Sequence, residues 1–81
     1  MENWLMLTLV GKDRPGIVAK ISQSLFDMQG NLGEASMTRL GGNFTIMLMV
    51  YVPESKTVVQ KNLQQICDEL DLFFHLDAIE A

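Results

Sequence analysis

The hydrophobic positions change their period several times along the chain, and each change marks the border of a predicted element. Residues 4–10, WLMLTLV, are apolar at odd and at even positions, so a strand here would be apolar on both faces. Such a strand is typical of the centre of a sheet that is covered on both sides. We expect Gly11 to end it.

The period becomes helical after Pro15, where apolar residues recur at i, i+4 and i+8 as Ile17, Ile21 and Leu25. Pro15 suits the first helical position, because the amide hydrogen that it lacks would have no partner there. Asp13 lies close enough to cap the free amides, and Gly30 suits the left-handed residue that ends many helices. The pattern predicts a helix over about 15–29.

The rest of the chain alternates again between strand and helix periods. The predicted order is strand, strand, helix and strand, over residues 31–40, 44–52, 56–71 and 73–79. The Gly-Gly-Asn sequence at 41–43 is typical of a tight turn between two strands. Ser55 can cap the second helix, whose apolar stripe is predicted to contain Val59, Leu63, Ile66 and Leu70.

This order predicts the fold class. A strand–helix–strand–strand–helix–strand chain with right-handed crossovers places both helices on one face of a four-stranded antiparallel sheet. The expected class is α+β with the ferredoxin-like βαββαβ arrangement, and the first and third strands lie in the centre. We expect residues 1–81 to form a single domain. Since this topology hosts many unrelated functions, the function has to come from other features.

Composition and charge exclude several classes of partner. The net charge is −4, which argues against direct nucleic-acid binding because phosphates require a basic surface. The only cysteine is Cys67, so no internal disulfide is possible and a reducing compartment is expected. Glu2 stands where a signal peptide would carry a basic residue, and no apolar run could span a bilayer. The prediction is a cytoplasmic protein without a membrane partner.

Candidate chemistry concentrates in the segment GKDRPG, residues 11–16, between the first strand and the first helix. Free amides at a helix N-terminus carry the positive end of the helix dipole and can hold a carboxylate or phosphate. Gly11 and Gly16 lack Cβ atoms, which allows close approach to the backbone. From these residues alone, a plain strand-to-helix turn is the favoured interpretation.

The chain resembles the ACT domain, a regulatory module that senses amino acids in many metabolic enzymes. The motifs are DRPGIV at 13–18 and GN at 30–31, and the likeness extends from about Leu5 to Ile79. Within that family the chain most resembles the N-terminal ACT domain of glycine-cleavage-system transcriptional repressor-like proteins, as GGNFTIMLMV at 41–50 indicates. Those proteins usually carry two ACT domains, whereas this sequence contains one.

The resemblance implies a non-enzymatic regulatory domain that binds a small ligand, an amino acid by analogy. It would act through a homodimer or a second ACT domain, in transcriptional control of amino-acid metabolism, and without a cofactor or metal. The implied ligand-binding residues are Gly11, Asp13, Pro15, Gly16 and Ile17 in the loop, with Asn31 across from it. The loop amides suit a carboxylate, Asp13 an ammonium group, and the Asn31 amide can donate and accept. Asp13 as a helix cap and Asn31 as a turn residue remain open alternatives.

An interface is predicted on the sheet face away from the helices, where nothing remains in the fold to cover apolar side chains. The residues of this outer face are Trp4, Met6, Met47, Met49 and Tyr51. Flexible methionines fit irregular partner surfaces, and an exposed apolar patch usually marks an interface. The alternative is an open face that is merely apolar.

Two other functions are compatible with parts of the sequence. A pure interaction module would use the same surfaces without a ligand, and an acylphosphatase-like hydrolase would depend on Arg14, although the longer loop signature of those enzymes is absent. His75 and Asp77 share a strand face and could orient a general base, but no nucleophile accompanies them. We expect Cys67 to lie in the core, and no Cys/His spacing is typical of a metal site.

Overall fold

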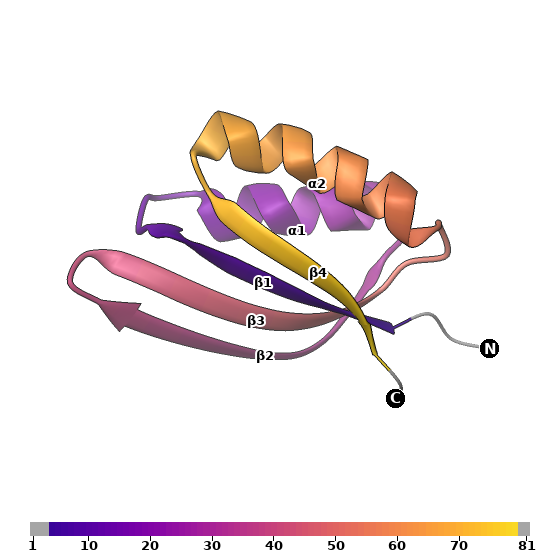
Figure 1. Ribbon diagram of the computed structural model, residues 1–81, viewed down its shortest axis with the longest axis horizontal. Helices are drawn as coiled ribbons and strands as arrows, with labels where there is room; N and C mark the ends of the chain where they lie inside the picture. The colour runs from indigo at the N-terminus through magenta and orange to yellow at the C-terminus, as the bar shows by residue number, and fades with distance from the viewer. Residues whose placement is uncertain (1–3, 80–81) are drawn as a thin grey trace.

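The computed structural model describes residues 4–79 and contains six elements in the predicted order (Figure 1). The strands are β1 (Trp4–Lys12), β2 (Asn31–Leu40), β3 (Asn43–Tyr51) and β4 (Phe73–Ile79), and the helices are α1 (Ile17–Asp27) and α2 (Lys56–Leu70). The strands form one antiparallel sheet in the order β2-β3-β1-β4, and both helices cover the same face. The predicted ferredoxin-like fold is confirmed, with β1 and β3 in the centre.

The core lies between the sheet and the two helices. On β3 every second residue is buried, as the alternation of its sequence predicts. Each helix buries three side chains in the core. These are Ile17, Ile21 and Leu25 of α1 and Val59, Leu63 and Cys67 of α2. Ile66 and Leu70, predicted for the same stripe, are partly buried and pack at its border. No polar or charged side chain among residues 4–79 is buried.

The first strand is longer than predicted. Gly11 continues β1, which ends at Lys12 opposite Asn43. The glycine leaves room for Leu72, since a Cβ atom at this position would lie 2.5 Å from Cδ2 of Leu72 and that side chain would have to shift. The prediction that Gly11 ends the strand is therefore wrong, and its place in the chain is explained by packing.

The first helix begins later than predicted. Gly16 is its N-cap residue and has φ +83°, a left-handed conformation that cannot continue into a right-handed helix. Pro15 consequently lies in the turn before α1 and not at its first position. Asp13 does not cap the helix, since its carboxylate accepts a hydrogen bond from Arg39 instead.

The end of the first helix also differs in detail. The left-handed residue is Gln29, with φ +61°, and not Gly30. Gly30 is required by close packing, because a Cβ atom there would lie 2.8 Å from the carbonyl oxygen of Leu25. The second helix starts as predicted, with Ser55 Oγ accepting a 3.3 Å hydrogen bond from the Val58 amide.

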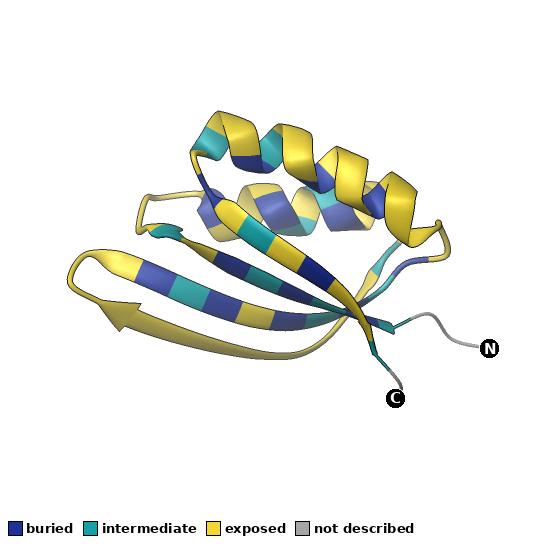
Figure 2. Cartoon of the chain, viewed as in Figure 1, coloured by how far each residue is buried: buried dark blue, intermediate teal, exposed yellow. Residues whose placement is uncertain are grey.

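Strand β2 forms an exposed edge of the sheet, and all ten of its residues are exposed (Figure 2). A two-residue turn at Gly41 and Gly42, with φ +55° and +80°, joins it to β3. A bulge between Leu32 and Ala35 shifts its register. Because neither helix covers β2, its side chains toward α1 line the hollows described below. Within the described chain, no helix has the length and apolar character needed to cross a membrane.

Candidate ligand site at the start of α1

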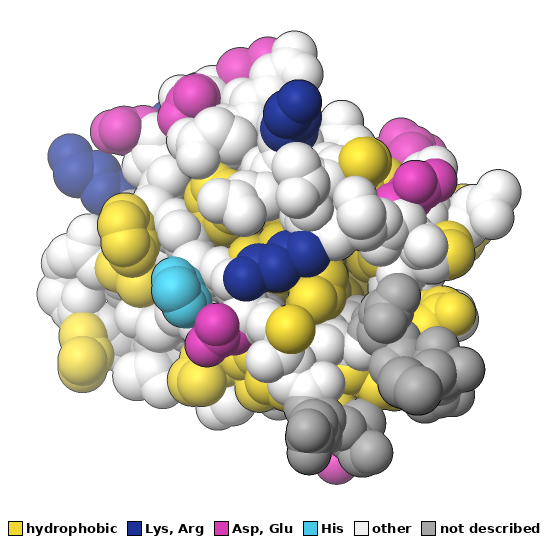
Figure 3. All heavy atoms as spheres, turned by 45° about the vertical axis from the view of Figure 1, so that its right-hand side comes forward, with side chains coloured by type: hydrophobic (Ala, Val, Ile, Leu, Met, Phe, Trp, Pro, Cys, Tyr) yellow, Lys and Arg dark blue, Asp and Glu magenta, His cyan; other side chains and the backbone are white. Residues whose placement is uncertain are grey.

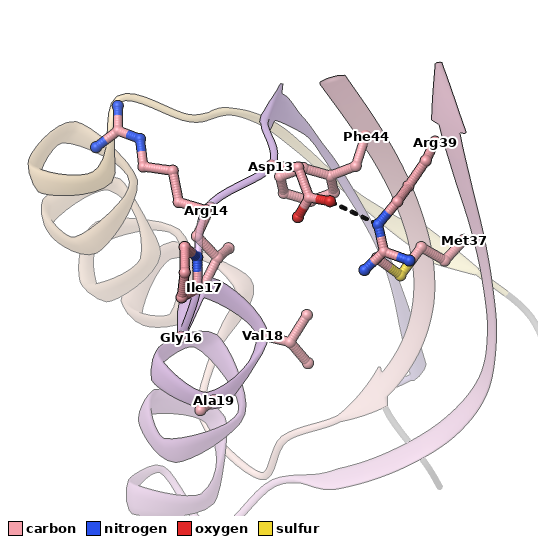
Figure 4. Close-up of a pocket in the computed structure, with 10 residues that line it drawn as sticks. Asp13, Arg14, Gly16, Ile17, Val18, Ala19, Met37, Arg39 and Phe44 are labelled. Atoms are coloured by element: carbon pink, nitrogen blue, oxygen red, sulfur yellow. Dashed lines mark hydrogen bonds and ion pairs between the residues drawn. The ribbon is translucent and has the colours of Figure 1, made fainter. Parts of the chain in front are cut away.

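A pocket of about 440 Å³ opens where the loop after β1 meets the first turn of α1 and the end of β2 (Figure 4). Residues 13–16 of the loop and residues 17–19 of α1 form one wall. The side chains of Met37 and Arg39 on β2, with Phe44 on β3, form the other. The pocket thus joins segments that are distant in sequence.

The first turn of α1 supplies hydrogen-bond donors to this pocket. The amides of Ile17, Val18 and Ala19 have no partner among residues 4–79, because the first amides of a helix lack an intrahelical acceptor. Gly16 has no side chain that could cap them, and the first turn contains no acidic residue. The positive end of the helix dipole therefore faces the pocket without a capping side chain.

An ion pair stands at the mouth of the pocket. Nε of Arg39 donates to Oδ2 of Asp13 at 2.6 Å, and the two side chains are 63% and 38% exposed. An ion pair with this exposure adds little to stability. Its effect is to place a cation and an anion side by side, pointing toward each other next to the free amides (Figure 4). Both terminal nitrogens of Arg39 lack partners within the described residues.

The backbone holds Asp13 in this position. Its amide donates a 3.0 Å hydrogen bond to the carbonyl oxygen of Gly42, in the turn between β2 and β3. The loop and the hairpin that carries Arg39 are thereby tied together.

Four of the six predicted ligand-binding residues meet at this pocket, namely Asp13, Pro15, Gly16 and Ile17. Gly11 does not line it and packs beneath Leu72.

The predicted position of Asn31 across from the loop is wrong. Asn31 lies opposite Tyr51, which is opposite Trp4 at the start of β1, whereas the loop follows Lys12 at the end of β1. The eight steps from Trp4 to Lys12 span about 26 Å. Because β2 is antiparallel to β3, its Leu40 end and not its Asn31 end lies beside the loop.

Arg39, Met37 and Phe44 were missed by the reasoning from sequence. A signal for Arg39 exists, because a two-residue turn at Gly41–Gly42 sets Leu40 opposite Asn43 and hence Arg39 opposite Phe44. Phe44 alternates along its strand with the outer-face residues Met47 and Met49, so Phe44 and Arg39 opposite it lie on the helix-covered face. The sequence could therefore have indicated that Arg39 lies on the helix-covered face of the sheet, near the start of α1.

The other candidate groups lie outside this pocket or point away from it. The side chain of Arg14 points away from Asp13 and Arg39 (Figure 4). His75 and Asp77 both lie on β4, the edge strand opposite β2, and both side chains are exposed. Nε2 of His75 is 3.6 Å from Oδ2 of Asp77, and Figure 3 shows the histidine beside an acidic group on the surface. The part of the chain that the structure describes holds no cluster of three His, Cys, Asp or Glu residues suited to a metal ion.

Cys67 is fully buried in the core, as predicted. Burial, and after it the negative charge of Asp68, raises the pKa of the thiol to about 11. The thiol therefore stays protonated at neutral pH and serves as a small apolar side chain.

Comparison with known proteins shows the family of this chain. Residues 3–77 match the ACT domain, and the chain belongs to that family. The UPF0237 protein lin0537 of Listeria innocua is 34% identical over 65 residues, which cover 80% of this chain and 68% of that protein. The glycine cleavage system transcriptional repressor of Escherichia coli is 33% identical over 72 residues, covering 88% of this chain and 38% of the repressor. The resemblance predicted from sequence is confirmed.

A solved structure of an ACT domain protein agrees with this family assignment. The ACT domain protein from Streptococcus pneumoniae superimposes with a TM-score of 0.82 at 26% identity, over 96% of this chain and 91% of that one. The chain spans little more than a third of the Escherichia coli repressor, so its relation to that whole protein concerns one domain only.

Proposed function

We propose that this chain is a non-enzymatic regulatory domain that binds a free amino acid in the pocket at the start of α1. The observation that carries the proposal is the pairing of Arg39 and Asp13 beside the free amides of α1. An amino acid presents a carboxylate and an ammonium group on one carbon atom. The pocket offers a complement to each of them.

The chemistry of each contact is specific. Arg39 has two unpartnered terminal nitrogens that can donate to the ligand carboxylate, together with the amides of residues 17–19. The free lone pairs of the Asp13 carboxylate can accept from the ammonium group while the bond to Arg39 Nε is kept. The close approach of the ligand to the backbone is possible at Gly16, where no atom lies within 4 Å of a Cβ position.

The second part of the proposal concerns association. The outer face contains the rings of Trp4 and Tyr51, which are tilted by 58° with centroids 5.9 Å apart, and Met6 directly opposite Met49. Met47, on the same face, is 47% exposed. Aromatic residues and methionine are enriched in protein interfaces. The proposed partner is a second copy of this chain or a second ACT domain, placed sheet against sheet.

The regulatory consequence follows from combining the two parts. A ligand that binds one association state more tightly than the other shifts the equilibrium by that difference in affinity. The similarity to a transcriptional repressor supports a role in the control of amino-acid metabolism, exerted through contacts with other proteins.

Calorimetric titration with the proteinogenic amino acids, extended into the millimolar range, tests the ligand. Arg39→Gln and Asp13→Asn should each weaken binding by about 1–3 kcal/mol, since each leaves a charged ligand group without its partner. Lys61→Gln is the matched control, because it removes the same charge from an exposed position of α2 that lines neither hollow. No heat with any amino acid would contradict the proposal and favour a pure interaction module.

A further inference from the structure

A second hollow of about 290 Å³ lies between α1 and β2 and adjoins the pocket. Val18 on α1 and Met37 on β2 line both hollows, so the two meet at these side chains. We name the second hollow the α1–β2 groove. Its floor consists of Leu9, Ile46 and Leu48 from the sheet, and Ala35 lies in its β2 wall.

The α1–β2 groove is apolar and open to water. Val18, Leu32 and Met37 are 50%, 49% and 40% exposed, although burial would favour each of them. Of its lining residues only Ser22 and Ser36 have polar side chains, and Ser36 lies opposite Met47, on the outer face of the sheet. A contiguous apolar hollow of this kind usually marks a binding site.

Among the residues that line the two adjoining hollows, charged side chains belong only to the pocket at the start of α1. Arg39 follows Met37 by two residues on the same face of β2, and Asp13 pairs with it there. From the pocket the groove runs past Met37 and Val18 toward Ala35 and Leu32. A ligand whose charged head group lies between Arg39 and Asp13 can therefore place an apolar tail against protein along the α1–β2 groove.

We propose that the α1–β2 groove holds the ligand side chain, and that the ligand is an amino acid with an aliphatic side chain such as leucine, isoleucine or methionine. This inference rests on the proposed function, because it takes the head group to be bound by Arg39 and Asp13. A charged side chain is excluded, since the groove offers no compensating charge. Glycine, alanine and serine are disfavoured because they leave the groove empty.

The expected selectivity can be stated as a ratio. Each methylene group that is removed from water contributes a factor of about four in affinity. Leucine has three more carbon atoms than alanine, and the groove is half open, so leucine should bind at least about tenfold more tightly. N-acetylleucine and leucinamide, which each lack one charge of the head group, should bind more weakly than leucine.

Calorimetry with leucine, methionine, alanine, glycine and aspartate tests the inference. Ala35→Leu fills the groove from an exposed position of β2 and should bring the leucine-to-alanine affinity ratio close to one. Ala78→Leu is the matched control, because it makes the same change at an exposed position of the opposite edge strand and should leave the ratio unchanged.

The outcomes separate this inference from the proposed function. Binding of glycine or alanine without a gain for leucine would overturn the inference and leave the proposed function standing. An equal loss of the ratio in both variants would overturn the inference as well. Absence of heat with every amino acid would overturn the proposed function and the inference together.

Discussion

Cys67 shows how the environment of one residue sets the pH dependence of stability. Its pKa is about 11 in the folded chain, compared with 9.0 as the ordinary value. As the pH rises, the unfolded chain therefore loses the thiol proton first, and the free energy of unfolding falls between about pH 9 and pH 11. At about pH 10.5 the loss due to this group is about 2 kcal/mol.

Urea unfolding at about pH 8 and about pH 10.5 measures this loss. Cys67→Ala removes the thiol and should show a smaller loss between the two pH values, which separates this effect from the titration of lysine and tyrosine. The same pH dependence in both proteins would show that burial of the thiol does not control its titration.

At the scale of the element, β2 is the strand that the fold supports least. It pairs only with β3, and every one of its residues is exposed, whereas the other edge strand, β4, buries Leu76. We expect the hydrogen-bonded amides of β2 to exchange with solvent faster than those of β4, since fewer apolar contacts oppose local opening. Hydrogen exchange followed by NMR measures this, and equal protection of the two edge strands would contradict it.

The elements also show what could be predicted from sequence and what could not. The period of the apolar residues and the stop signals locate all six elements, because side-chain period depends only on local geometry. The start of α1 was misplaced because the left-handed conformation of Gly16 depends on how the turn closes against the rest of the fold. A capping role for Asp13 was considered for the same reason, but its partner Arg39 is 26 residues away.

For the candidate site, the sequence predicted the residues of the loop before α1 but not the residues that β2 contributes. The loop residues follow one another in the chain, so their proximity needed no knowledge of the fold. The contribution of β2 depends on strand register, which places Arg39 beside the loop and Asn31 at the far end of the sheet. The β2 wall of the α1–β2 groove likewise exists only because β2 lies at an edge that neither helix covers.

At the scale of the whole molecule, the outer face is expected to carry self-association. Replacing Met47 and Met49 together by aspartate should dissociate the protein, because charged side chains would be buried without partners in the interface. Sedimentation at micromolar concentration measures the association state, and circular dichroism checks that the variant is folded. Phe26→Asp is the control, since Phe26 is 73% exposed on α1, in the layer opposite the outer face. A monomeric wild type over this range would contradict the expectation.

The central claim is that the corner formed by the β1–α1 loop, α1 and β2 binds an amino acid. The most direct test is a titration of the isotopically labelled chain with leucine, followed through the NMR shifts of its backbone amides. The account predicts saturable shifts at residues 16–19 and at residues 35–39, which border the pocket and the groove. It predicts no comparable shifts at Trp4 or Ile79, which pair at the opposite end of the sheet and line neither hollow. Shifts confined to that opposite end, or no saturable shifts up to millimolar leucine, would contradict the account.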